Sequence, residues 1–202
     1  MPQIPSAADF HQVDNSIARR RSIMAFAGKP VPQDLLKDLF DAAKTAPSAF
    51  NEQPWRFVYA LREEAEHFGN LLDCLEEGNQ VWAKDAPLLV AVLARPNLLR
   101  NERPNKHFAY DTGAAVAYFT LKATAEGLFV HQMGGFSEER ARKNLKIPED
   151  IQPLAFMAVG FEGDPAALPE NLQKRHNNKT PRKDVGEFVF RGAFGEAHHL
   201  DR

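Results

Sequence analysis

The sequence predicts an α+β domain in which helices flank one central sheet, and it leaves an α/β arrangement open. Two observations lead to this class. Several segments repeat apolar residues every three to four positions, as amphipathic helices do, and short continuous apolar runs typical of buried strands alternate with them. No internal repeat, low-complexity tract or Ser/Gly linker interrupts the 202 residues. One domain spanning residues 1–202 is therefore expected.

Helices are expected where apolar residues recur at helical spacing and capping residues mark the ends. Pro32 suits a first helical turn, and Pro47 stops the same helix. Gly78 and Gly127 are expected to end two further helices, and Ser137 can cap a short one. The helix before Gly127 is apolar nearly all round, which predicts that it is fully buried. The predicted helices cover about residues 14–21, 32–46, 62–77 and 111–126, and the short one follows residue 137.

Strands are expected where aromatic and β-branched residues cluster, or where an apolar run is short and continuous. The segment 55–61 shows the first pattern, and the segments 88–94 and 154–161 show the second. A fourth strand is expected over 128–133. The tail after about residue 170 is polar and basic until Phe188-Val189-Phe190.

Composition argues against several classes of protein. The formal net charge of −2 provides no overall field that would draw the chain to nucleic acid or anionic lipid. No apolar stretch approaches the ~18 residues that cross a bilayer, and the N-terminus lacks the basic start and apolar run of a secretory signal. The single cysteine, Cys74, allows no intrachain disulfide and suits a reducing compartment. We expect a cytoplasmic protein with neither nucleic acid nor a membrane as partner.

The common catalytic motifs are absent from the sequence. It contains no G-x-G-x-x-G or G-x-x-x-x-G-K-[ST] for a nucleotide and no G-x-S-x-G for a serine hydrolase. The seven histidines form no H-E-x-x-H pair, so no metal site is expected. Cys74 lies among the apolar residues of its helix, which favours a packed thiol over a nucleophile.

Two segments carry side chains that suit a planar, phosphorylated ligand. Arg20, Arg21 and Ser22 offer guanidinium forks and a hydroxyl to one phosphate, although runs of arginine also occur at solvated helix ends. The amides of Asn51 and Gln53 match the alternating donors and acceptors at the edge of a flavin or a base. A plain connection between a helix and a strand is the alternative interpretation of the second segment.

A third segment, Gln132-Met133-Gly134-Gly135-Phe136, follows a predicted strand. It is either a tight turn whose glycines need a positive φ, or a backbone that approaches a planar ligand and offers it N–H groups. On the residues alone, both interpretations stay open.

Taken together, these segments resemble the signatures of the nitroreductase family. The resemblance extends from about Ser16 to Phe190, and four signatures in the right order argue against chance agreement. In chain order the matching pieces are Arg20-Arg21-Ser22-Ile23 with Phe26; Ala46-Pro47-Ser48 with Asn51, Gln53, Pro54 and Trp55; Asp111-Thr112-Gly113-Ala114-Ala115 with Met133-Gly134-Gly135-Phe136; and Pro181-Arg182-Lys183 with Glu187-Phe188-Val189-Phe190.

The resemblance implies a nitroreductase-like fold with a central mixed sheet, in a homodimer whose C-terminal segments are exchanged. It also implies noncovalently bound FMN. The implied contacts are Arg20, Arg21, Ser22, Arg182 and Lys183 at the phosphate and ribityl end, Pro47, Ser48 and Asn51 along the ring and ribityl chain, Asn51 and Gln53 at the polar ring edge, and Met133, Gly134 and Gly135 near N5 and O4. One departure is Met24, because the family often has a basic residue there.

By this resemblance, FMN takes a hydride from NADH or NADPH and then reduces an electron-poor acceptor such as a nitroaromatic or a quinone. No catalytic side chain is required. The alternatives are flavin-fragmenting, ene-reductase or dehalogenase chemistry on the same fold, and a flavin-binding protein without turnover. The loop over residues 97–108 is expected to select the acceptor. Its basic residues Arg100, Arg103 and Lys106 are candidates for a 2′-phosphate contact, although an exposed basic loop also explains them.

Overall fold

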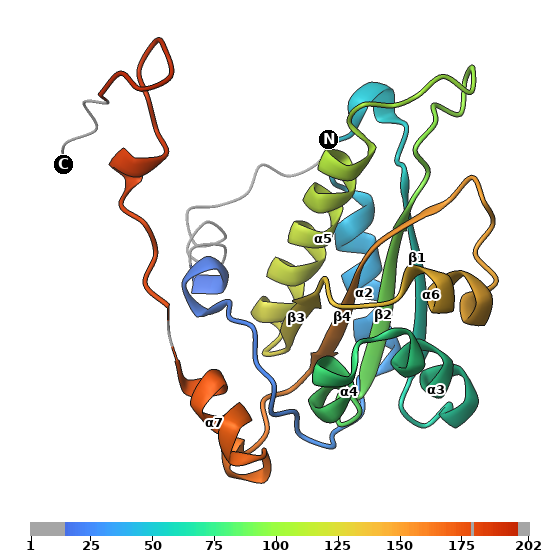
Figure 1. The fold of residues 1–202 in the computed structure, drawn as a ribbon, viewed down its shortest axis with the longest axis vertical. Helices are drawn as coiled ribbons and strands as arrows, with labels where there is room; N and C mark the ends of the chain where they lie inside the picture. The colour runs from blue at the N-terminus through green and yellow to red at the C-terminus, as the bar shows by residue number, and fades with distance from the viewer. Residues whose placement is uncertain (1–14, 179, 198–202) are drawn as a thin grey trace.

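A computed structural model describes residues 15–178 and 180–197 of the chain (Figure 1). A four-stranded sheet in the order β1-β2-β4-β3 lies between two layers of helices. All four predicted strands are confirmed, with bounds β1 (Trp55–Leu61), β2 (Leu88–Ala94), β3 (Phe129–Met133) and β4 (Gln152–Gly160). Every neighbouring pair is antiparallel. The parallel pairing that a mixed sheet requires is therefore not present among these four strands.

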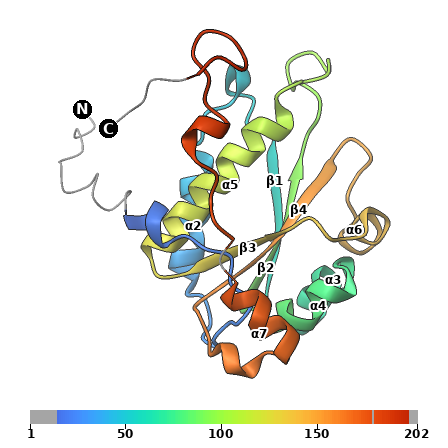
Figure 2. The same ribbon diagram turned by 60° about the vertical axis from the view of Figure 1, so that its left-hand side comes forward.

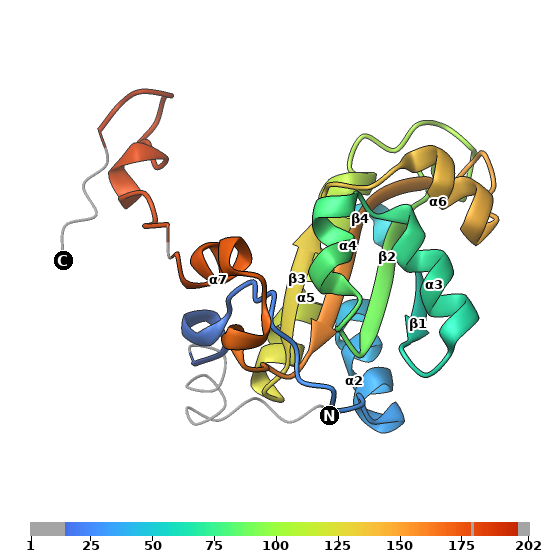
Figure 3. The ribbon, with the colours of Figure 1, turned by 60° about the horizontal axis from the view of Figure 1, so that its bottom comes forward.

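The central strand β2 shows why the sheet is buried on both faces. Its side chains alternate between two cores, because successive residues of a strand point to opposite faces. Leu88, Val90 and Val92 pack with α2 (Gln33–Lys44) and α5 (Phe108–Ala125). The alternate residues of β2 pack with α3 (Ala65–Cys74), α4 (Glu77–Ala83) and α6 (Glu138–Leu145), which cover the other face (Figure 3).

The single helix predicted over residues 62–77 is wrong. The chain forms α3 and α4 there, and Gly78 lies inside α4 instead of ending a helix. The break falls at Leu75, which is extended (φ −73°, ψ 156°), fully buried and paired with Phe136 in an isolated β-bridge. Pairing with a distant segment therefore overrides the local helical pattern.

The other predicted helices are present with small shifts of their ends. Residues 15–19 are helical, α2 follows its N-cap Pro32, and the Ser137 hydroxyl accepts a hydrogen bond from the Arg140 amide at the start of α6. The tail contains a further helix, α7 (Glu170–Asn177). In the described part of the chain, no helix is long and apolar enough to cross a membrane.

The prediction that helix α5 is fully buried is wrong. One face packs on the sheet, but the opposite face is open, and Tyr110 and Tyr118 are 81% and 42% exposed. Gly113 and Ala117 are exposed on the same face. This stripe carries no charged residue. An uncharged open stripe of this kind marks a surface that another molecule can cover.

Two terminal segments frame the domain. The N-terminal segment crosses beside the end of β4, where Phe26 pairs with Glu162 and the Gly163 amide donates to the Ala25 carbonyl over 3.0 Å. A side chain at Gly163 would lie 2.5 Å from the Phe26 carbonyl carbon, so this crossing requires glycine. Beyond α7, residues 180–197 form a C-terminal arm that leaves the body of the domain (Figures 1 and 3).

Candidate functional site

The N-terminal segment of the described chain and the start of the C-terminal arm meet at a cavity of about 440 Å³. Arg20, Arg21 and Ser22 line it from the N-terminal segment, and Arg182 lines it from the arm. Lys183 is exposed beside Arg182 but does not line the cavity. With Arg19 and Thr180, which also line it, four guanidinium groups and two hydroxyls surround one cavity and form a donor set suited to a phosphate. Further lining residues are Ala18, Arg19, His176, Asn178 and Thr180.

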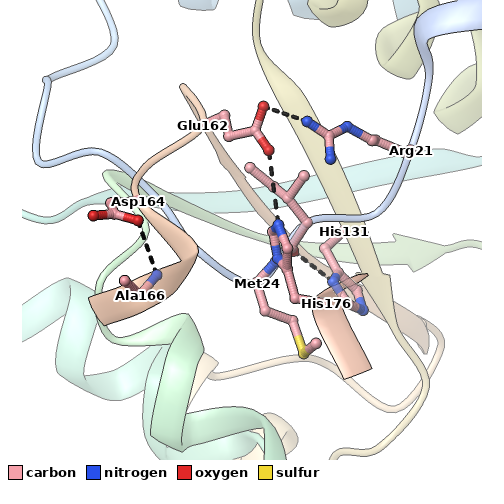
Figure 4. Close-up of polar contacts among 8 residues, drawn as sticks. Arg21, Met24, His131, Glu162, Asp164, Ala166 and His176 are labelled. Carbon is pink, nitrogen blue, oxygen red and sulfur yellow. Dashed lines mark hydrogen bonds and ion pairs between the residues drawn. The ribbon is translucent and has the colours of Figure 1, made fainter. Parts of the chain in front are cut away.

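The arginines of this cavity are not equivalent. The Arg21 guanidinium pairs with Glu162 (Figure 4). It also lies 5.1 Å from the centre of the Phe129 ring. Arg20 and Arg182 have no ion-pair partner within residues 15–178 and 180–197. An anion entering the cavity would therefore find these two cations uncommitted, whereas Arg21 is fixed by a carboxylate.

His176 connects the cavity to the N-terminal segment. Its Nδ1 accepts a hydrogen bond of 3.2 Å from the Met24 amide, and its Nε2 lies 3.7 Å from Glu162 (Figure 4). The side chain is almost fully buried. These contacts join α7, the segment containing Met24 and the turn after β4. The Met24 side chain itself is buried.

His131, on β3, contacts the same N-terminal segment. Its Nδ1 lies 2.7 Å from the Ile23 carbonyl, and because a carbonyl only accepts, Nδ1 carries the proton. The ring also packs on Trp82, with centroids 4.4 Å apart. Burial lowers the pKa of His131 below its usual value, and the nearby Arg175 and His176 lower it further. His131 therefore acts as a hydrogen-bond donor that fixes the backbone at Ile23.

A second group of predicted residues lies in the connection between α2 and β1. The Ser48 hydroxyl accepts from the Gln53 amide over 3.0 Å, and the Asn51 carbonyl accepts from the Gln53 side chain over 3.1 Å. Asn51 and Gln53 both have positive φ, at 57° and 47°. The exposed Pro47 precedes them. These hydrogen bonds give the loop a fixed shape with the Asn51 side chain exposed.

The third group lies at the end of β3. Met133 is buried, and the Gly135 carbonyl accepts from the Glu76 amide and from the Asn79 side chain, each over 3.0 Å. Of the two interpretations left open by the sequence, the tight turn with positive φ is contradicted, because the positive-φ glycines of the described chain lie at 127, 192 and 195. Added side-chain bulk at Gly134 would meet nothing within 4 Å. Neither a positive φ nor close packing requires glycine at position 134.

The cavity and the Ser48 loop lie at opposite ends of α5. The Ala49 amide donates to Asp111, in the first turn of α5, over 2.9 Å. At the other end, Arg19 and Glu126 share the lining of one hollow. The 18 residues of α5 rise ~1.5 Å each, so about 27 Å separates the two ends. One chain therefore holds the arginine cavity and the Ser48 loop far apart, and Figure 2 shows how α5 extends across the domain between its two ends.

Comparison with known proteins identifies the fold and the family. The sequence profile of the Nitroreductase family matches residues 17–161, well over half of the chain. The chain belongs to the nitroreductase family. A putative NADH dehydrogenase/NAD(P)H nitroreductase of Stenotrophomonas maltophilia (strain R551-3) is 36% identical over 186 residues, covering 83% of this chain and 93% of that protein. A similar protein of Streptomyces griseus is 30% identical over 171 residues, covering 75% and 85%.

Solved structures agree with this assignment. A crystal structure described as an oxidoreductase containing FMN has a TM-score of 0.83 and 33% identity, and covers 97% of this chain and 96% of that chain. An FMN-dependent nitroreductase from Clostridium difficile, with a TM-score of 0.66 and 20% identity, covers 90% and 99% and shows the shared fold. This nitroreductase family member is thus an oxidoreductase with the α+β fold that the sequence predicts.

Sequence reasoning missed several polar residues of this family member's candidate site. His176, Asn178 and Thr180 line the cavity, Glu162 fixes Arg21, and Asn79 fixes the Gly135 carbonyl. None lies in a recognisable motif. Only the basic character of the segment around His176 gave a signal, and a solvated loop explains that signal equally well.

Proposed function

We propose that this protein is an NAD(P)H-dependent FMN oxidoreductase whose single domain spans residues 1–202. Bound FMN would supply the redox chemistry, taking a hydride from NADH or NADPH and then reducing an electron-poor acceptor such as a nitroaromatic or a quinone. The observation that carries the proposal is the convergence of Arg20, Arg21, Ser22 and Arg182 on one cavity. The similarity to the oxidoreductase containing FMN supports it. A cytoplasmic location stays a prediction.

The residues present fit FMN at both of its ends. Arg20 and Arg182 hold the phosphate as uncommitted cations, while Arg21 keeps its place through Glu162. Ser22 adds a hydroxyl and Lys183 adds charge nearby. At the far end, the open Gly134 admits the ring against the backbone, where N–H groups donate to it. The protein needs no side-chain nucleophile or general acid for this chemistry.

We propose that the arginine cavity and the Ser48 loop are two half-sites, and that a second copy of this chain brings them together. Two copies packed in opposite directions along the uncharged stripe of α5 would bring the start of one helix beside the end of the other. Pro47, Ser48, Asn51 and Gln53 of one subunit then complete the FMN site whose phosphate the other subunit holds. The open stripe, with Tyr110 81% exposed, supports this arrangement.

The C-terminal arm offers a second contact between the copies. Phe188 is 59% exposed and Phe194 is 93% exposed, so the arm places apolar area in water unless something covers it. β1 forms an edge of the four-stranded sheet, and a groove of about 500 Å³ lined by Phe40 and Tyr59 lies beside it. We propose that the arm of one subunit docks in this groove of the other. A strand added there in parallel would make the sheet mixed.

The experiment is an absorbance spectrum of the purified protein before and after NADH or NADPH is added without oxygen. We expect FMN bands that bleach on addition and return when a nitroaromatic or quinone is supplied. Bands that do not bleach would leave a flavin-binding protein without this activity. A protein that contains no flavin and binds no added FMN would contradict the proposal.

A further inference from the structure

Phe50 is the residue whose placement is hardest to explain by folding alone. Its φ is 55°, a left-handed conformation that is strained for a bulky side chain. Its ring is also 71% exposed. A large aromatic side chain that is both strained and mostly open to water contributes no buried apolar packing to the fold. This combination points to a ligand that uses the ring.

The surroundings hold Phe50 in this conformation from both sides. The Ala49 amide is tied to the buried Asp111. On the other side, the Glu52 carboxylate is 8% exposed and accepts from the Leu99 amide over 2.7 Å. The loop is therefore fixed by long-range contacts to α5 and to the segment after β2, so it is not a flexible excursion.

Arg100 lies directly on this ring. Its guanidinium carbon is 3.8 Å from the Phe50 ring centre, and its Nε is 3.9 Å from Glu52. Half of the Arg100 side chain is exposed, and its terminal NH₂ groups have no hydrogen-bond partner within the described ranges. The hairpin that carries it is braced by Arg95 and Glu102, which form two bonds of 2.7 Å. A guanidinium oriented in this way is prepared for an anion.

We propose that Phe50 and Arg100 form a binding site for the anionic group of a planar substrate that docks over the flavin. This inference rests on the proposed function. Phe50 stands between Ala49 and Asn51, on the loop that supplies the ring-edge contacts, so the pair adjoins the place where donor and acceptor bind in turn. The shared chemistry is a phosphate or carboxylate on a planar molecule. Two sources fit: the 2′-phosphate of NADPH and an acidic group on the acceptor.

The test compares Arg100→Gln with Arg103→Gln, which removes the same charge from the same loop without disturbing the stacked pair. Each is assayed for kcat/KM with NADPH against NADH, and with 4-nitrobenzoate against the neutral 4-nitrobenzamide. Because a charge-assisted contact is lost, Arg100→Gln should lower kcat/KM for the anionic member of one pair about tenfold, and Arg103→Gln should not. A change in the first pair assigns the 2′-phosphate, and a change in the second assigns the acceptor.

Binding measured by calorimetry separates this inference from the proposed function. Two pairs of ligands are titrated into the FMN-loaded protein, or into the protein as purified if it binds no FMN. The first pair is adenosine 2′,5′-bisphosphate and adenosine 5′-phosphate, and the second is 4-nitrobenzoate and 4-nitrobenzamide. Arg100→Gln should remove the preference for the anionic ligand of one pair even if no turnover occurs.

Unchanged preferences in every pair, or an equal loss for neutral and anionic ligands, would overturn the inference. A Phe50→Gly variant that becomes monomeric while the anion preference persists would also overturn it. That result would assign the ring to the subunit interface.

Discussion

The split of the candidate site between two chains can be tested by subunit complementation. One variant, Arg20→Ala with Arg182→Ala, removes two of the four arginine side chains that line the cavity. The other, Asn51→Gly with Gln53→Gly, removes both amide side chains and keeps the positive φ that glycine tolerates. Differently tagged chains are coexpressed, and mixed dimers are isolated by two affinity steps. FMN binding is then measured by fluorescence titration.

The expected binding curve follows from the geometry. Because the half-sites lie at opposite ends of α5, about 27 Å apart, one site of the mixed dimer combines both defects and the other has none. Half of the sites should therefore bind FMN with wild-type affinity. Two lost charge-assisted bonds weaken binding by about 3–6 kcal/mol, and two lost neutral bonds weaken it by about 1–3 kcal/mol. The sites that combine both defects should therefore bind FMN far more weakly than the wild-type sites, and the titration separates the two. A mixed dimer with no site of wild-type affinity would refute the shared site.

Three further predictions concern single residues. Arg20→Ala should weaken FMN binding by about 1–3 kcal/mol and leave riboflavin binding unchanged, measured by fluorescence titration. Because burial holds the pKa of His131 below the ordinary 6.5, the unfolded chain takes up this proton first as pH falls. The unfolding free energy should therefore fall below about pH 6.5, and His131→Asn should flatten that loss in urea titrations. Gly163→Ala should cost about 1–3 kcal/mol of stability, whereas Gly28→Ala, with open space around it, should change stability by less than about 0.5 kcal/mol.

Each of these has a distinct contrary result. Equal weakening of riboflavin and FMN by Arg20→Ala would mean that the arginine does not contact the phosphate. An acid loss of stability that persists in His131→Asn would place the responsible group elsewhere. Equal urea midpoints for Gly163→Ala and Gly28→Ala would mean that the crossing at Phe26 adapts freely.

The strands were predictable from sequence because their signal is local. β2 is a continuous apolar run, and burial on both faces follows from that alone. The division between α3 and α4 was not predictable, because Leu75 fits the helical pattern of the sequence. Only its pairing with Phe136 gives it an extended backbone. The open face of α5 was hidden for another reason. Glycine, alanine and tyrosine suit a core and an interface equally, so composition cannot distinguish them.

The candidate site shows the same limit. Arg20 and Arg182 are far apart in sequence, and only family resemblance joined them before the structure placed both on one cavity. Glu162 and Asn79 act by fixing other groups, and such roles depend on distances that no motif encodes. The sequence also left the role of Gly134 open. The structure shows that it has no positive φ and that no atom would lie within 4 Å of an added Cβ, so neither a tight turn nor close packing requires glycine there.

The exposed stripe of α5 yields a prediction that joins assembly to flavin binding. Ala117 lies in the middle of this stripe, far from both half-sites, and Ala117→Arg would bury an unpaired charge in any interface formed there. Such burial costs several kcal/mol, so the variant should be monomeric by sedimentation velocity while its circular dichroism stays native. Ala65→Arg, on the exposed start of α3, should remain dimeric.

If the site is shared, the Ala117→Arg monomer should also lose FMN, although the substitution touches no proposed ligand. Flavin binding and dimerisation should then show one common dependence on protein concentration, because each stabilises the other by mass action. A monomer that retains FMN with wild-type affinity would mean that one chain closes the site by itself. The separation of Ser48 from the arginine cavity along α5 would then have to be bridged by movement within the chain, and the C-terminal arm, which already carries Arg182 into the cavity, is the segment positioned to make it.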